Sequence, residues 1–122
     1  MLRGIRGAIT VEYDIESEVI SATEELLEKI LEVNPSLHSD DIASILFTVT
    51  EDIRSVHPAK AARKLGWTTV PLLCSTEIPV SNSLTKCIRA LIHWNTDLRQ
   101  NEIKHVYLRE AIILRPDLIK TI

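Results

Sequence analysis

Residues 2–11 read LRGIRGAITV, a run in which apolar side chains recur at every second position. Ile5, Ile9 and Val11 fall on one face, and Arg6 falls on the other, less apolar face. A period of two residues predicts a β-strand. We therefore expect the chain to begin with a strand whose second face presents an arginine.

A long amphipathic helix is predicted directly after this strand. From Asp14 to about Val33 apolar residues recur at helical spacing, and six glutamates take the opposite face. Asn34 and Pro35 end the pattern, because proline disfavours the helical region for the residue before it. A short second helix is predicted at residues 57–65, where Pro58 stands in the first turn and is followed by three alanines, with Gly66 as the stop signal.

Four further stretches are predicted as strands: residues 42–50, 67–77, 86–94 and 105–114. The first is apolar enough for a buried strand. The second contains Pro71, which favours an edge or irregular position because proline has no N–H for a ladder. The third alternates cleanly and places Arg89 on the face opposite Ile88 and Trp94.

Strands outnumber helices in this pattern, and a single long helix is available to cover the sheet. The predicted class is therefore α+β, with a mixed sheet, one long amphipathic helix and one short helix. The remaining sheet face is also apolar in part, so we expect it to pack against further copies of the chain in a closed cyclic oligomer.

Composition limits the possible functions. The chain of 122 residues (13.8 kDa) fits one domain, residues 1–122. A net charge of −3 and 4% aromatic residues argue against nucleic-acid binding. No apolar run reaches the roughly 18 residues of a membrane span, and no signal peptide is evident, so we expect a cytoplasmic protein that does not bind membranes. Cys74 and Cys87 lack metal-ligand spacing and are expected to be reduced, buried thiols.

The arginines are the strongest functional signal. Eight occur in the chain, and Arg6, Arg89 and Arg115 lie in or beside apolar, strand-like runs. A guanidinium group beside packed β-structure is costly unless it finds a hydrogen-bonded partner, and these runs contain too few carboxylates. Each arginine alone is more often structural than functional, but together they indicate a small, multiply anionic ligand.

Five segments in this order resemble the monofunctional chorismate mutases of the AroH type: RGIRGAIT (3–10), HPAKAAR (57–63), VPLLCSTE (70–77), KCIRAL (86–91) and HVYLREAIILRPDL (105–118). The resemblance extends over nearly the whole chain. It implies a homotrimer whose sheets form a pseudo-α/β barrel, with active sites between subunits. The implied reaction is the Claisen rearrangement of chorismate to prephenate in aromatic amino-acid biosynthesis, with no cofactor and no metal.

The resemblance also implies which residues form the site. One subunit would supply Arg6, Cys74, Glu77, Arg89, Tyr107 and Arg115, and its neighbour would supply His57, Ala59, Lys60 and Arg63. The sequence departs from the Bacillus pattern at His57, where that enzyme has phenylalanine, and at Leu73, where it has threonine. These departures change the polarity of the expected cleft wall and its edge.

The resemblance implies a role for each of these residues, and the chemistry of the substrate is consistent with those roles. Arg89, Arg6 and Glu77 are expected to be catalytic: Arg89 would donate to the ether oxygen, Arg6 with Tyr107 would bind the enolpyruvyl carboxylate, and Glu77 with Cys74 would bind the ring hydroxyl. In a regular strand Cys74 and Glu77 face opposite ways, so we expect a bend between them.

The remaining expectations concern the rim of the site. Lys60 and Arg63, three residues apart on a helical turn, would close over the substrate. Arg115 opens a tail, from about residue 115, that we expect to be flexible.

Two other functions stay open. A trimeric binding module could capture a carboxylate metabolite with the same arginines. An imine or enamine hydrolase of a similar small trimeric fold could also use an arginine to hold a substrate carboxylate.

Overall fold

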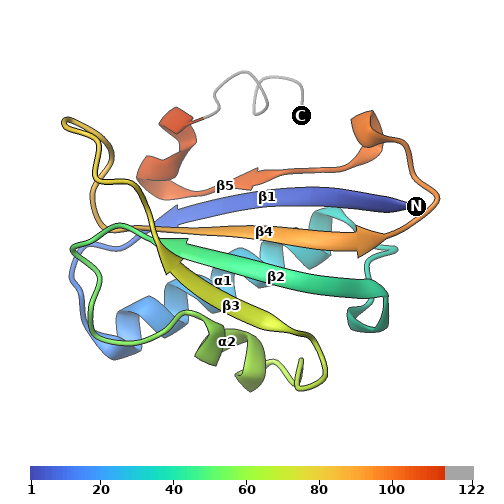
Figure 1. The fold of residues 1–122 in the computed structure, drawn as a ribbon, viewed down its shortest axis with the longest axis horizontal. Coiled ribbons are helices and arrows are strands. Elements are labelled where there is room, and N and C mark those ends of the chain that lie inside the picture. The colour runs from blue at the N-terminus through green and yellow to red at the C-terminus, as the bar shows by residue number, and fades with distance from the viewer. Residues whose placement is uncertain (115–122) are drawn as a thin grey trace.

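The computed structural model describes residues 1–114. Its centre is a five-stranded sheet with the strand order β3-β2-β4-β1-β5 (Figure 1). The strands are β1 (Leu2–Thr10), β2 (Ile42–Val49), β3 (Leu72–Thr76), β4 (Cys87–Asn95) and β5 (Val106–Tyr107). β4 runs antiparallel to β1 and β2, whereas β5 pairs in parallel with β1 and β3 in parallel with β2. The predicted α+β class with a mixed sheet is confirmed.

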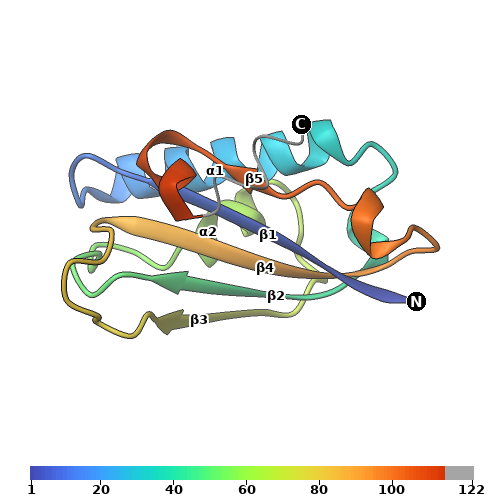
Figure 2. The same ribbon diagram turned by 90° about the horizontal axis from the view of Figure 1, so that it is seen from above.

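Both α-helices lie on the same face of the sheet (Figure 2). α1 (Glu16–Val33) confirms the long predicted helix and begins two residues later than expected. It packs closely over β1: a Cβ atom at Gly7 would lie 2.8 Å from the Ile30 Cδ1 atom. The main core, which includes Ile5, Phe47 and Trp94, fills the space between this face and the helices.

α2 (Ala59–Lys64) confirms the short helix. Pro58 precedes it directly, and Gly66 ends it with a φ of 92°, a left-handed conformation that residues with a Cβ rarely adopt. The Gly66 N–H donates to the Arg63 carbonyl at 3.0 Å, and the Trp67 N–H donates to the Ala62 carbonyl at 3.1 Å. These two bonds satisfy carbonyls that a helix end leaves open.

The opposite face of the sheet is covered by neither α1 nor α2 (Figures 1 and 2). Strand register identifies its residues. Arg6 of β1 lies opposite Leu91 of β4, and Arg89 of β4 lies opposite Ala8 of β1 and Thr48 of β2. The predicted alternation in β1 and β4 is therefore confirmed, and both arginines lie on this face, which we call the open face. β2 buries only its other side, so it is less buried than we predicted.

The predicted strand over residues 105–114 is wrong beyond Tyr107. β5 has two residues, and a 3₁₀ helix follows at Arg109–Leu114. The end of β1 explains the change, because Arg109, with a φ of 57°, donates from Nη1 to the Thr10 carbonyl at 2.9 Å, and the Glu110 N–H donates to Thr10 Oγ1 at 3.2 Å. These contacts turn the chain and place Ala111 against Ala8 on the open face.

The predicted strand over residues 67–77 is correct only in its second half. β3 begins at Leu72, after Pro71, and is an edge strand as predicted. The bend that we expected between Cys74 and Glu77 is not there. β3 stays in register with β2 to Thr76, and the Glu77 N–H continues the ladder to the Val49 carbonyl at 2.8 Å.

Candidate active site

Arg89 and Glu77 form the centre of the candidate site. The Arg89 Nε atom lies 3.8 Å from the Glu77 Oε2 atom, and about a quarter of each side chain is exposed, 25% and 27%. Thr48 on β2, between these two residues, donates its hydroxyl to the same Glu77 oxygen at 2.5 Å. Strands β2 and β4, together with the residue that directly follows β3, thus hold one carboxylate and one guanidinium group side by side on the open face.

The Arg89 guanidinium group has an unused donor. Its Nε atom is buried and has no hydrogen-bond partner among the described residues. The 3.8 Å separation from Glu77 exceeds the 2.7–3.2 Å of a hydrogen bond, so Glu77 supplies charge but no bond there. A buried donor without a partner is costly, so this Nε–H is available to an acceptor from outside the described residues.

Arg6 and Tyr107 lie on the same face as Arg89. Tyr107 is opposite Ala8, which is in turn opposite Arg89, and only 4% of Tyr107 is exposed. Arg6 lies one row of the sheet away, and its guanidinium group has no ion pair or hydrogen bond within residues 1–114. The structure therefore brings four of the predicted site residues onto one face: Arg6, Glu77, Arg89 and Tyr107.

A buried thiol lies at the base of this group. Cys87 is fully buried in a small cluster with Ala8, Tyr107 and Ala111. Burial raises the pKa of the Cys87 thiol above its ordinary value of 9.0, against the opposing effect of the Arg89 charge. The thiol is therefore neutral near neutral pH and does not offset the charge of Arg89. Both cysteines of the chain are free, as predicted, although Cys74 is only half-buried.

The other predicted residues lie on separate surfaces. Cys74 is opposite Phe47 and packs on the helix side of the sheet, where it lines a hollow of about 320 Å³ with His57. Leu73 points the other way and is 66% exposed. Within one chain the structure brings Cys74 to His57 and not to Glu77.

The α2 residues form a third group. Ala59 is buried, Lys60 pairs with Glu16 of α1 at 3.2 Å, and Arg63 is exposed with no ion pair or hydrogen bond inside the described range. Arg115 and the predicted tail lie outside the described residues. Within that range no group of three His, Cys, Asp or Glu residues could hold a metal ion. No helix of the same range is long and apolar enough to cross a membrane.

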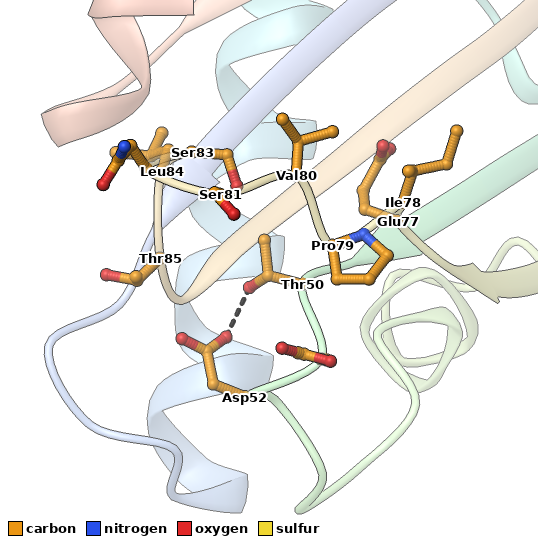
Figure 3. Close-up of a pocket in the computed structure, with 12 residues that line it drawn as sticks. Thr50, Asp52, Glu77, Ile78, Pro79, Val80, Ser81, Ser83, Leu84 and Thr85 are labelled. Carbon is orange, nitrogen blue, oxygen red and sulfur yellow. Dashed lines mark hydrogen bonds between the residues drawn. The ribbon is translucent and has the colours of Figure 1, made fainter.

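A loop beside Glu77 encloses a second hollow, of about 350 Å³, lined by residues 77–85 and 50–52 (Figure 3). Asp52 anchors this loop. Its two carboxylate oxygens accept the Lys86 N–H at 2.9 and 3.1 Å, and one also accepts the Thr50 hydroxyl. Lys86 has a φ of 48°, so Asp52 holds a turn that feeds directly into β4 and Arg89.

Sequence reasoning missed Thr48 and Asp52. The alternation in residues 42–50 was enough to put Thr48 on the less buried face of its strand. The alternation could not predict the order of strands in the sheet. The Thr48 hydroxyl lies beside Glu77 and Arg89 because β2 lies between β3 and β4.

Replacing Asp52 with alanine should destabilise the fold without removing a site residue. The Lys86 N–H and Thr50 hydroxyl would lose their acceptor, which should cost about 1–3 kcal/mol and lower the melting temperature by several degrees. Thermal unfolding followed by circular dichroism measures the change. Glu51→Ala removes a neighbouring carboxylate that makes no side-chain hydrogen bond or ion pair with residues 1–114, and it should leave the melting temperature unchanged. Equal melting temperatures for both variants would contradict the anchoring role.

The comparisons with known proteins agree with this geometry. Residues 2–118 match the family model described as "Chorismate mutase type I". The chain belongs to this family. Among curated relatives of the type I chorismate mutases, the chorismate mutase AroH of Thermus thermophilus is 54% identical over 118 residues, covering 97% of both chains. The chorismate mutase AroH of Bacillus subtilis (strain 168) is 48% identical over 122 residues, covering 99% of this chain and 95% of its own.

A solved structure gives the same result for the fold. A chorismate mutase from Clostridium thermocellum superposes with a TM-score of 0.88 at 48% identity, covering 90% of this chain and 97% of its own. The type I chorismate mutase resemblance seen in the sequence is thus confirmed, and the matched residues include Arg6, Glu77 and Arg89.

Proposed function

We propose that this protein catalyses the Claisen rearrangement of chorismate to prephenate, the reaction after which its family is named. Chorismate is a dianion, and the reaction breaks an ether C–O bond while a C–C bond forms, with no proton transfer and no nucleophile. A catalyst must hold a compact conformer and place positive charge where negative charge develops. The observation that carries the proposal is the buried Nε–H of Arg89, which lies beside Glu77 on the open face and has no hydrogen-bond partner among the described residues.

The proposed roles follow from position. Arg89 donates to the ether oxygen as the C–O bond breaks, because its permanent charge makes it a preorganised donor. Arg6 and Tyr107, on the same face, bind the enolpyruvyl carboxylate. Glu77 accepts the ring hydroxyl. Cys74 helps Glu77 to hold the ring hydroxyl, and it also lines the hollow that includes His57.

We also propose a homotrimer that builds its sites between subunits and forms the pseudo-α/β barrel. Two observations support this assembly. Arg63 is exposed and belongs to α2, which lies on the helix side of the sheet and not on the open face. The open face also presents an apolar row, in which Leu46 lies between Leu73 and Leu91, that neither α-helix covers. Burying such a row against another copy is favourable.

Under this proposal the enzyme works in the cytoplasm in the synthesis of phenylalanine and tyrosine. The proposed Arg115 contribution, added positive charge at the rim of the site, lies outside the described residues. The carboxylate-binding module and the imine or enamine hydrolase are the competing functions. Incubating the purified protein with chorismate, following the loss of its ultraviolet absorbance and identifying prephenate as product, separates all three. A protein that binds chorismate without converting it would support the binding module instead.

The reaction should be nearly insensitive to pH. No general acid or base takes part in the proposed reaction, and the donors that it uses are guanidinium groups, which are not deprotonated in proteins. The raised pKa of the Cys87 thiol also prevents a thiolate from forming beside Arg89 until the pH exceeds the ordinary cysteine value. We therefore expect kcat/KM to be nearly constant from about pH 6 to about pH 9. A bell-shaped profile with single-proton slopes would instead give a protonic role to Cys74 or His57.

A further inference from the structure

Thr48 connects the two central residues of the site. It lies opposite Arg89 across the β2–β4 pair and opposite Ser75 across the β2–β3 pair, two residues before Glu77. Its hydroxyl donates to Glu77 Oε2 at 2.5 Å, the same oxygen that lies 3.8 Å from Arg89 Nε. A β-branched side chain on a strand has restricted χ1 freedom, so this hydroxyl is a fixed donor.

The Thr48 hydroxyl determines which contacts Glu77 can make. It engages Oε2, while Oε1 has no hydrogen-bond partner within the described part of the chain. A carboxylate held this way keeps one oxygen free for a ligand hydroxyl. It also stays too far from Arg89 Nε to accept that donor's hydrogen bond.

We propose that Thr48 is a positioning residue that holds the Glu77 carboxylate in place. It keeps Glu77 from forming a hydrogen bond with Arg89, and it leaves Glu77 Oε1 facing the substrate hydroxyl. The inference rests on the proposed function, because it assigns Thr48 a part in the same site. Carboxylate and guanidinium groups that are free to move form short, often bidentate pairs. Without the threonine hydroxyl, Glu77 would move the last ångström toward Arg89 and occupy the donor that the reaction needs.

The test begins with Thr48→Val, which keeps the shape of the side chain and removes the hydroxyl. We expect kcat to fall about 10- to 100-fold, since misplacing a catalytic group by about 1 Å has effects of this size. KM should change much less, because the lost arrangement matters most in the transition state. Thr48→Ser restores the hydroxyl and should stay within about threefold of the parent. Should the valine variant fail to fold, Thr48→Ala removes the same hydroxyl and is measured in its place.

A double-mutant cycle with Glu77→Ala shows whether Thr48 acts through Glu77. With no carboxylate to hold, Thr48→Val should lower kcat by less than about threefold further. If the fold-losses in kcat of Thr48→Val and Glu77→Ala multiply fully in the double variant, the positioning role is wrong. The matched control is Ser75→Ala, which removes a hydroxyl beside Thr48 on the open face that makes no hydrogen bond with described residues, and it should leave kcat unchanged.

The outcomes separate this inference from the proposed function. If the parent protein converts chorismate but Thr48→Val keeps kcat within about threefold, the positioning role is wrong and the proposed function stands. If the parent fails to convert chorismate, the proposed function is wrong and the inference falls with it. A loss in Thr48→Val that Thr48→Ser does not rescue would also overturn the inference, because it would reflect packing and not the hydroxyl.

Discussion

Replacing Arg89 with alanine should lower kcat by about 10² to 10³ while KM rises far less. The guanidinium group has a buried Nε–H without a partner among the described residues. In the proposed role, its interaction with the ether oxygen strengthens as the C–O bond breaks. An interaction made mainly in the transition state appears in kcat and not in ground-state binding. Steady-state kinetics with chorismate, on a variant shown by circular dichroism to be folded, measures both constants.

A positive charge at position 89 should not by itself restore kcat. Arg89→Lys keeps one positive charge but loses the planar fork and moves the donor, so we expect it to be badly impaired as well. The matched control is Arg99→Ala, which removes an exposed arginine beyond the far end of β4 and should leave kcat within about threefold of the parent. A folded Arg89→Ala protein that keeps kcat within about tenfold of the parent would contradict the role of Arg89.

The sequence predicted the parts of the site that depend on local periodicity. The alternation of β1 and β4 was sufficient to place Arg6 and Arg89 away from the core face, and the structure confirms both. α1 was equally predictable from the sequence, because apolar residues that recur at helical spacing over 18 residues indicate an amphipathic helix. Gly66 marked the end of α2 for a physical reason, since its φ of 92° suits a residue without a Cβ.

Long-range contacts account for what the sequence could not predict. The residues after Tyr107 alternate like a strand, but Thr10, about a hundred positions earlier, accepts bonds from Arg109 and Glu110 and turns them into a 3₁₀ helix. Thr48 and Glu77 meet because β2 and β3 are parallel neighbours. Neither pairing has a signature within a short window of sequence.

Mixing two inactive variants should restore activity if the sites lie between subunits. Arg63 is on α2 and Arg89 is on the open face, so a shared site needs Arg63 from one chain and Arg89 from another. Each single variant should be nearly inactive, Arg89→Ala for the reason given above and Arg63→Ala because a cation that closes over the dianion is lost. In a mixed trimer, an Arg63→Ala chain can supply Arg89 while its neighbour, an Arg89→Ala chain, supplies Arg63.

The size of the restoration follows from counting. In an equal mixture that assembles at random into cyclic trimers, each site has an intact Arg89 in about half of cases and an intact Arg63 from the neighbour in about half of those. About a quarter of the parent activity should therefore return, against residual activities of about 1% or less in the Arg89→Ala chain alone. The two variants must be unfolded and refolded together, or produced in the same cell, so that subunits mix.

A second mixture gives the control that makes this result specific. Arg6 and Arg89 lie on the same face of the same chain, so Arg6→Ala and Arg89→Ala chains cannot complete one another in any order around a trimer. That mixture should stay inactive under the conditions in which the first recovers. Recovery in both mixtures would indicate refolding artefacts. Recovery in neither mixture, from trimers shown by native mass spectrometry to contain both variants, would place Arg63 outside the site. A monomer with full activity at nanomolar concentration would contradict the shared site directly, because a single chain keeps Arg63 and Arg89 on different sides of its sheet.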